Sequence, residues 1–226
     1  MKKAYLNIGI LGLMVLLFAS CKREDSSLVD QNRIYMDLSY TYYGGSNTAS
    51  ASAEFRVNDA NGRKIELSYP SQVKFNDQVM SWQKLTGNYR TANFISSNGG
   101  TFEFQDHDGN QYYNKAYAVK LAELPIGLDR ISKNADLYIP WQGESVQPGD
   151  ELKITIKAGV TETFRTTQTG STFIRIEHRH LEDLIPGEGT IEIQRVNTIG
   201  VSQGTDSGGI ITLTYKGRVR DIEVVE

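Results

Sequence analysis

The fold is decided by a stretch in which every second side chain is apolar or aromatic, Ile34-Tyr35-Met36-Asp37-Leu38-Ser39-Tyr40-Thr41-Tyr42. Successive side chains of a strand point to opposite faces, so this alternation predicts a strand with one buried face. The turn residues Gly44-Gly45-Ser46-Asn47 interrupt the pattern, and extended character resumes from Ala49 to Val57. The segment therefore predicts a β-hairpin.

The same pattern continues along the chain on both sides of a mixed segment at 123–136. Further strands are expected over residues 64–68, 72–75, 79–82, 91–95, 101–104, 112–120, 137–141, 151–157, 161–166, 172–178, 190–196, 210–215 and 219–225. Only 180–185 has the pattern of a short helical turn. Many short strands with Gly and Asn turns between them are typical of sandwiches and barrels, so the fold class is predicted to be all-β.

The strand count favours two domains over one. Pro125 and Gly127 break the strand rhythm near the middle of the chain, which places a linker at 123–136. The halves, 33–122 and 137–226, each carry enough strands for an immunoglobulin-like β-sandwich, which runs to about 100 residues. We therefore expect two tandem immunoglobulin-like β-sandwich domains, with a single large sandwich as the alternative.

The N-terminus has the order of a secretory signal. Lys2 and Lys3 precede an apolar run from Ile8 to Phe18, and the small residues Ala19 and Ser20 follow. An α-helix needs about 20 apolar residues to cross the bilayer core, and this run is much shorter. Residues 1–20 are therefore predicted to be a cleaved signal peptide rather than a membrane span.

Phe18-Ala19-Ser20-Cys21 resembles the lipobox of bacterial lipoproteins, although phenylalanine replaces the usual leucine at its first position. The resemblance implies that the thiol of Cys21 is acylated and that cleavage occurs just before it. Two acyl chains suffice for stable membrane attachment. The polar segment 21–32 is then expected to be a flexible tether.

Lys22-Arg23-Glu24-Asp25 resembles the charged export signal of surface lipoproteins of the Bacteroidetes, and a plain solvated tether is the alternative. With the lipobox and the strand pattern, the chain resembles the uncharacterised β-rich lipoproteins of that group. This resemblance implies a lipid-anchored protein of the outer membrane, on its periplasmic face or exported to the cell surface. It also implies an adhesive or binding role and carries over no functional residues.

The net charge argues against one class of function, and the cysteine content excludes one means of stabilising the fold. The signal carries two of the 24 basic residues, so the remainder has 22 against 27 acidic residues, a net charge of −5. Nucleic-acid binding needs a concentrated basic face, so we expect no nucleic-acid partner. Cys21 is the one cysteine, so no intramolecular disulfide is available and the fold is expected to depend on core burial.

A hydrolase motif is present but lacks its context. Gly200-Val201-Ser202-Gln203-Gly204 fits the G-x-S-x-G elbow, in which a strand-to-helix turn exposes the serine. Here Gly-rich sequence and then the strand at 210–215 follow, so a loop is the better interpretation. We expect no enzyme activity and no catalytic residues.

Two clusters are weak candidates for metal binding. His178 and His180 are two apart on an expected strand, which would place both imidazoles on one face, yet a third ligand is missing. Asp106, Asp108 and Asn110 have alternate oxygen ligands, as calcium loops do, but lack the distal glutamate. A strand end and an Asp-Gly turn explain these residues more simply, so we expect no metal and no cofactor.

Flat aromatic side chains on a rigid sheet can stack on sugars. The weak candidates for such a surface are Trp82, Trp141, Tyr35 and Tyr43. Packing alone favours aromatics in strands, and alternation buries about half of them. The main hypothesis is therefore a non-catalytic envelope lipoprotein that binds a partner protein or surface polymer, and the alternative is a carbohydrate-binding accessory lipoprotein.

Overall fold

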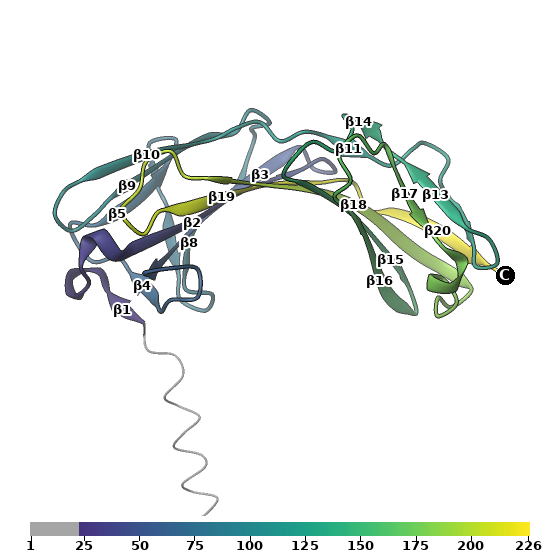
Figure 1. The fold of residues 1–226 in the computed structure, drawn as a ribbon, viewed down its shortest axis with the longest axis horizontal. Coiled ribbons are helices and arrows are strands. Elements are labelled where there is room, and N and C mark those ends of the chain that lie inside the picture. The colour runs from purple at the N-terminus through teal and green to yellow at the C-terminus, as the bar shows by residue number, and fades with distance from the viewer. Residues whose placement is uncertain (1–22) are drawn as a thin grey trace, which may run out of the picture.

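The computed structural model describes residues 23–226, and the expected signal peptide and Cys21 lie outside this range. The described chain is almost entirely β, as the alternation predicted, with short 3-10 turns as its helical elements. Figure 1 shows an arch with a lobe at each end, and the chain begins in one lobe and ends in the other. Among these residues no helix is both long and apolar enough to span a membrane.

We call the two ends of the arch the N-lobe and the C-lobe. The strands of the N-lobe are β1 (Glu24–Asp25), β2 (Ile34–Tyr43), β3 (Thr48–Val57), β4 (Lys64–Glu66), β5 (Gln72–Phe75), β6 (Gln78–Val79), β7 (Ser81–Gln83), β8 (Asn88–Phe94), β9 (Gly100–Gln105) and β10 (Gln111–Ala116). Those that follow are β11 (Ala122–Glu123), β12 (Arg130–Ser132), β13 (Leu137–Pro140), β14 (Gln142–Gly143), β15 (Asp150–Ala158), β16 (Val160–Thr166), β17 (Phe173–Ile176), β18 (Gly187–Gly200), β19 (Gly209–Lys216) and β20 (Arg220–Val225).

The predicted hairpin is present and organises the N-lobe. β2 and β3 pair in register from Ile34 opposite Val57 to Tyr43 opposite Thr48. The inward side chains of β2 from Ile34 to Tyr40 are fully buried, and small alanines on β3 lie among their neighbours. Asn47 closes the turn with a positive φ of 54°, a conformation that asparagine tolerates better than most residues. The alternation in the sequence therefore becomes one dry and one wet face.

A second sheet, ordered β10-β9-β5-β6, packs on the hairpin to complete a sandwich. Its inward face is aromatic. The rings of Phe104 and Phe55 lie 4.5 Å apart between centroids, and those of Phe75 and Tyr40 lie 5.9 Å apart. Large aromatic side chains bury the most apolar area each, so this contact contributes strongly to the stability of the N-lobe.

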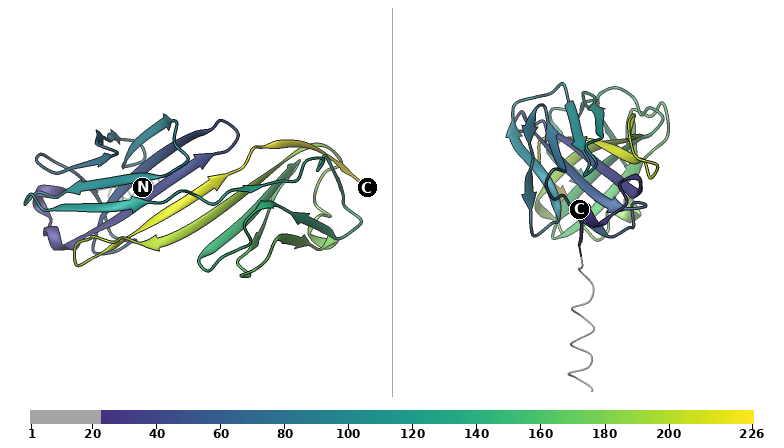
Figure 2. Two further views of the ribbon diagram at one scale, coloured as in Figure 1. Left: turned by 90° about the horizontal axis from the view of Figure 1, so that it is seen from above. Right: turned by 90° about the vertical axis from the view of Figure 1, so that its left-hand side faces the viewer.

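The main sheet continues from the N-lobe into the C-lobe. β19 pairs in parallel with β2 from Gly209 opposite Met36 to Lys216 opposite Tyr43, and then β18, β15 and β16 follow in antiparallel order. A Cβ on Gly209 would lie 2.3 Å from the Met36 carbonyl oxygen, so this close start of the pairing requires glycine. Figure 2 shows the long strands passing from one half of the molecule to the other.

Small sheets cover the main sheet in the C-lobe. β13 pairs with β17 and β11 pairs with β14, and their inward side chains face those of β15 and β18. The buried residues here are mostly aliphatic, namely Ile139, Leu152, Ile154, Ile156, Ile174, Ile176, Ile191 and Ile193. β20 pairs with β18 and, in parallel, with β12.

The expected boundary between two tandem domains is wrong. Segment 123–136 contains the end of β11 and all of β12, which pairs with the last strand, so it is not a free linker. β19 lies within the expected second domain, 137–226, yet it pairs with β2 of the expected first domain, 33–122. Strand patterns give the order of strands along the chain but not which distant strands pair. They therefore could not predict the sheet that the two halves share.

The expected tether at 21–32 is also wrong from residue 23 onward. Glu24 and Asp25 form β1, which pairs in parallel with β4. Two 3-10 turns follow, η2 (Ser26–Leu28) and η3 (Gln31–Arg33), and Ser26 and Gln31 are buried. Hydrogen bonds hold both side chains, since Ser26 Oγ donates to Ser71 Oγ and Gln31 Nε2 donates to the carbonyl oxygens of Ser26 and Val29. An ordered segment held by polar contacts has the polar composition that also predicts a flexible tether.

Candidate functional site

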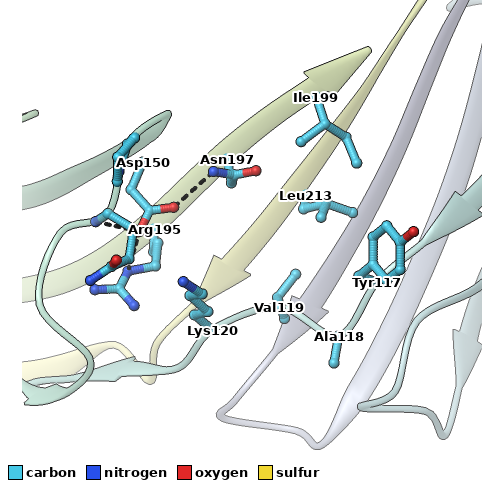
Figure 3. A pocket seen from close by; sticks show the side chains of 11 residues that line it. Tyr117, Ala118, Val119, Lys120, Asp150, Arg195, Asn197, Ile199 and Leu213 are labelled. Carbon is cyan, nitrogen blue, oxygen red and sulfur yellow. Dashed lines mark hydrogen bonds and ion pairs between the residues drawn. The ribbon is translucent and has the colours of Figure 1, made fainter. Parts of the chain in front are cut away.

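A pocket lined by both apolar and charged side chains lies where the two lobes meet. It is a cavity of about 250 Å³ between the segment that crosses from β10 to β11 and the long strands β18 and β19. Figure 3 shows side chains from both sides converging on it. It is lined by Tyr117, Ala118, Val119, Lys120, Gln147, Pro148, Asp150, Arg195, Asn197, Ile199 and Leu213. We call it the junction pocket.

One wall of the junction pocket is apolar. Val119 and Leu213 are buried, and Ile199 packs partly against the core. Tyr117 and Ala118 stand at the exposed rim, with Tyr117 56% exposed. An apolar wall that remains open to solvent gains free energy when another apolar group covers it.

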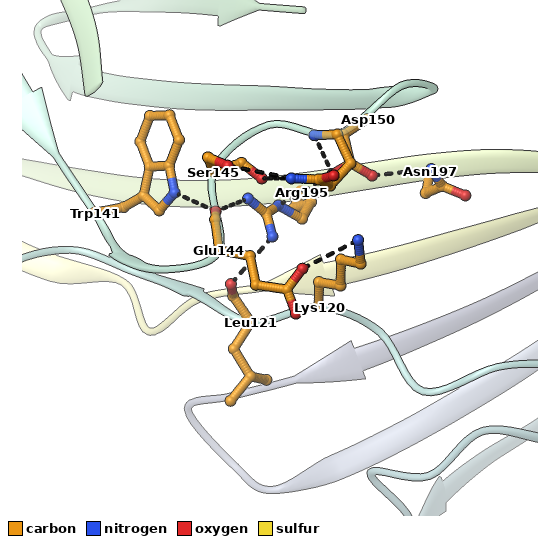
Figure 4. Close-up of polar contacts among 9 residues, drawn as sticks. Lys120, Leu121, Trp141, Glu144, Ser145, Asp150, Arg195 and Asn197 are labelled. Atoms are coloured by element: carbon orange, nitrogen blue, oxygen red, sulfur yellow. Dashed lines mark hydrogen bonds and ion pairs between the residues drawn. The ribbon is translucent and has the colours of Figure 1, made fainter. Parts of the chain in front are cut away.

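The other wall is built on a buried arginine, shown in Figure 4. Arg195 is 2% exposed, and its guanidinium donates to the carbonyl oxygens of Glu144 and Leu121. Its Nε lies 3.9 Å from Asp150 Oδ2 and has no hydrogen-bond partner. Burial lowers the pKa of Arg195, and the charges of Asp150 and Glu144 oppose that shift. Arginine nevertheless stays charged in proteins, so this wall carries a fixed cation.

Asp150 neutralises that cation and is itself fully engaged. Its Oδ1 accepts from Asn197 Nδ2 at 2.9 Å, and its Oδ2 accepts from the Gln147 amide at 3.0 Å. A second ion pair, between Lys120 Nζ and Glu144 Oε2 at 3.1 Å, lies at the rim. The polar groups thus bind one another. The pocket can therefore accept an apolar group, with charged side chains at its rim.

Sequence reasoning missed Arg195, and a signal for it was present. Period-two alternation in β18 puts Ile191 and Ile193 on the inward face, and both are fully buried. Arg195 is the next residue on that face. A charged residue in an inward position is rarely buried without a partner, so its placement indicates a polar network.

The four aromatic candidates are not brought together. Trp141 is buried, and its indole donates to the Glu144 carbonyl oxygen at 2.9 Å. Trp82 lies under the Arg23 guanidinium, 5.2 Å from ring centroid to Cζ. Tyr35 and Tyr43 stand near opposite ends of β2. The Glu144 carbonyl oxygen accepts from both the Trp141 indole and Arg195, so Trp141 helps to hold the loop that Arg195 contacts.

The two histidines do not share a strand face, because the strand ends at Ile176. His178 and His180 lie in the 3-10 turn η4 (His178–His180), so the predicted turn begins two residues earlier than expected. His178 Nδ1 contacts Asp136 Oδ1 at 3.3 Å. Within residues 23–226 no three His, Cys, Asp or Glu side chains gather as a metal site would require.

The Asp106 segment forms a turn around its own carboxylate. Asp106 is fully buried and accepts from the Asn110 amide at 2.8 Å and from its side chain at 2.9 Å. Asp108 lies exposed at the tip. The turn between β9 and β10 was the simpler interpretation of these residues, and its geometry matches that interpretation.

Ser202 belongs to a loop rather than to a nucleophile elbow. Its amide donates to Asn114 Oδ1 at 2.8 Å, and its hydroxyl donates to the Tyr113 carbonyl oxygen at 3.3 Å. Thr205 and Gly208 continue the loop as far as β19. The serine therefore fixes the 201–208 loop against β10, and the Gly-rich loop predicted from sequence is confirmed.

Comparisons with known proteins give matches among solved structures alone. No family model matches the chain, and no curated protein matches it. Among solved structures, a tetra-tandem repeat in the extending region of a large adhesion protein is 17% identical over 84% of this chain, with a TM-score of 0.27. A structure of a bacterial ice-binding adhesin is 10% identical over 86% of this chain, with a TM-score of 0.25. The chain spans 50% of the first and 66% of the second.

Proposed function

We propose that this chain is a non-catalytic protein of the bacterial cell envelope, anchored to the outer membrane through acylated Cys21, that binds a partner protein through the junction pocket. The pocket carries the proposal. Its volume of about 250 Å³ is below the range of about 300–1,000 Å³ found for small-molecule sites. A single apolar side chain of a partner protein suits it better, since interface anchors fill such pockets.

The surroundings of the pocket favour the same occupant. Lys120 and Glu144 supply opposite charges at the rim, and interfaces typically surround an apolar centre with polar groups. The strands β18 and β19 form one wall of the pocket, and hydrogen bonds from Arg195 to the Leu121 and Glu144 carbonyl oxygens hold the segments that face them. A preformed pocket loses little conformational entropy when a side chain enters.

The partner is tested by closing the pocket. Ala118→Trp introduces a large side chain at the exposed rim, and Ala60→Trp is the matched control on the exposed turn between β3 and β4. After gentle detergent extraction of membranes, we expect a partner protein to co-purify with the original chain and with Ala60→Trp. Its equal recovery with Ala118→Trp would contradict the pocket as the binding site.

The anchor is tested separately in the membrane fraction. We expect the full chain to sediment with membranes and its N-terminal peptide to carry the mass of acyl chains on Cys21. Cys21→Ser removes the acylated thiol and should move the protein to the soluble fraction. A membrane-bound Cys21→Ser chain would contradict the anchor without bearing on the pocket.

Glycan binding is the second candidate, and one surface favours it. Tyr138 and Phe173 are exposed on the outer face of the β13–β17 sheet, with ring centroids 5.9 Å apart. Arg175 lies 6.0 Å from the Tyr138 centroid and pairs with Asp136. Aromatic faces beside charged groups suit sugar rings. Tight binding of envelope polysaccharide that Tyr138→Ala weakens, without any co-purifying protein, would favour this candidate.

A further inference from the structure

Three large apolar side chains are almost wholly exposed and adjoin, along the chain, residues that contact or belong to the first described segment. Leu85 is 100% exposed, Tyr69 95% and Leu28 84%. Exposed leucines and tyrosines occur singly on ordinary surfaces, but three held by contacts with one short segment indicate a contact surface. We call Leu28, Tyr69 and Leu85 the N-terminal surface.

Leu85 is held beside the first described residue. The Arg23 guanidinium donates to the carbonyl oxygen of Lys84 and lies over the ring of Trp82 at 5.2 Å. The turn between β7 and β8, which carries Leu85 at its tip, is therefore packed against Arg23. The hydrogen bond from Arg23 to the Lys84 carbonyl oxygen therefore places Leu85 next to the start of the described chain.

Tyr69 and Leu28 are held on the next residues of the chain. The Ser68 amide donates to Ser26 Oγ at 2.9 Å, and its hydroxyl donates to Asp25 Oδ1 at 2.5 Å. Tyr69 follows Ser68 directly, and Leu28 ends the 3-10 turn that Ser26 begins. All three apolar side chains thus adjoin residues that bind the segment 23–26.

The length of chain before this segment identifies what covers the surface. Cys21 is two residues from Arg23, and two residues span at most about 7 Å when fully extended. Resting on the proposed acylation of Cys21, we propose that the N-terminal surface docks on the lipid bilayer, with Leu28, Tyr69 and Leu85 entering its interface. A flexible tether over residues 21–32 would let the folded part lie away from the lipid. Because segment 24–33 is ordered, the folded part begins close to Cys21.

The chemistry of the surface suits the headgroup region. Leucine side chains favour the apolar boundary, and tyrosine is enriched where one end of a side chain is apolar and the other wet. The nearby acids are engaged, because Glu24 pairs with Arg63 and Asp25 accepts from Ser27 and Ser68. The surface therefore presents apolar tips whose neighbouring acids are paired, with the cations Arg23 and Lys84 beside Leu85.

The test relies on Cys21 being the sole cysteine of the chain. In the acylated full chain the Cys21 thiol is blocked, so Leu85→Cys introduces the one free thiol for a polarity-sensitive fluorophore. Ile95→Cys is the matched control, since Ile95 is 90% exposed at the other end of β8. The seven residues of β8 span about 20 Å. Both labelled chains are reconstituted in phosphatidylethanolamine–phosphatidylglycerol vesicles that contain lipids brominated on their acyl chains.

We expect a blue shift and a loss of emission through bromine quenching at position 85, and neither at position 95. Equal responses at the two positions, or no response at 85 in an acylated chain, would overturn the docking. A response at 85 that needs added cell extract would overturn it in favour of a protein partner. Thiol labelling of the original chain would show Cys21 to be free, which would overturn the anchor itself and the docking with it.

Discussion

The two lobes share one sheet but cover it by different means. In the N-lobe a four-stranded sheet lays an aromatic face on β2 and β3, through pairs such as Phe104 and Phe55. In the C-lobe two-stranded sheets cover aliphatic strands, and the loop after β14 is fixed by Arg195 and Trp141 on the Glu144 carbonyl. Aromatic packing therefore supplies most of the cover in the N-lobe, whereas in the C-lobe a buried charged side chain also holds a covering loop in place.

The largest expected effect tests whether the lobes are energetically one unit. Phe104→Ala should lower the free energy of unfolding by about 4 kcal/mol, because it leaves a cavity under an aromatic contact. Each lobe holds one tryptophan, Trp82 or Trp141. In a Trp82→Phe background, the denaturant transition reported by Trp141 should therefore move as well, since the sheet is shared.

The control for this measurement is Ile95→Ala, an exposed change in the same lobe that should leave the Trp141 transition in place. A Phe104→Ala chain whose Trp141 transition stays unchanged would indicate independent domains. That result would break the comparison, because each lobe would then have its own stability.

A smaller effect is expected from the polar contact of the C-lobe. Arg195→Ala should cost about 3 kcal/mol of unfolding free energy, because it leaves Asp150 buried without its counter-charge. Arg165→Ala is the matched change, since that guanidinium is 62% exposed and 3.5 Å from Glu151, and exposed pairs contribute about 0–1 kcal/mol. Denaturant unfolding followed by Trp141 fluorescence measures both, and equal losses would remove the distinction between buried and exposed arginines.

The smallest expected effect concerns an exposed ion pair of the C-lobe, between Arg175 and Asp136. Hydrogen bonds from Arg175, and then from His178, lower the pKa of Asp136 to about 2 from its ordinary 3.8. Because the folded pKa is the lower one, the stability that Asp136 contributes is present above pH 3.8 and is lost as the pH falls through about 2.

An NMR titration of the Asp136 carboxyl carbon measures this pKa directly. Arg175→Ala removes the main donor and should raise the pKa toward 3.8, with little change in unfolding free energy at neutral pH. An unshifted titration in Arg175→Ala would show that the arginine does not set the pKa.

Sequence patterns predicted the strands well and their partners poorly. The alternation from Ile34 to Tyr42 predicts a strand because its inward residues up to Tyr40 are fully buried and Tyr42 packs partly against the core. The pairing of β19 with β2 depends on a close backbone approach at Gly209, and a glycine in a loop-rich stretch gives no hint of the strand it meets. Register within a hairpin is local, whereas parallel pairing is not.

The candidate site was predicted even less well, for a related reason. The junction pocket combines Val119, Asp150 and Leu213, which come from three distant segments, and proximity in space cannot be read from spacing along one strand. Tyr35 and Tyr43 show the converse, since they share a strand yet stand near its opposite ends. Arg195 alone carried a local signal, its inward position after two buried isoleucines.

The parallel pairing of β2 and β19 has a mechanical consequence. A pulling force between Arg23 and the C-lobe would draw β2 toward its start and β19 toward its end, because the C-lobe follows Lys216. The two strands would then slide past each other lengthwise, and the hydrogen bonds between residues 36–43 and 209–216 would bear the load together rather than one after another. The molecule is therefore arranged to resist tension along its length through shear.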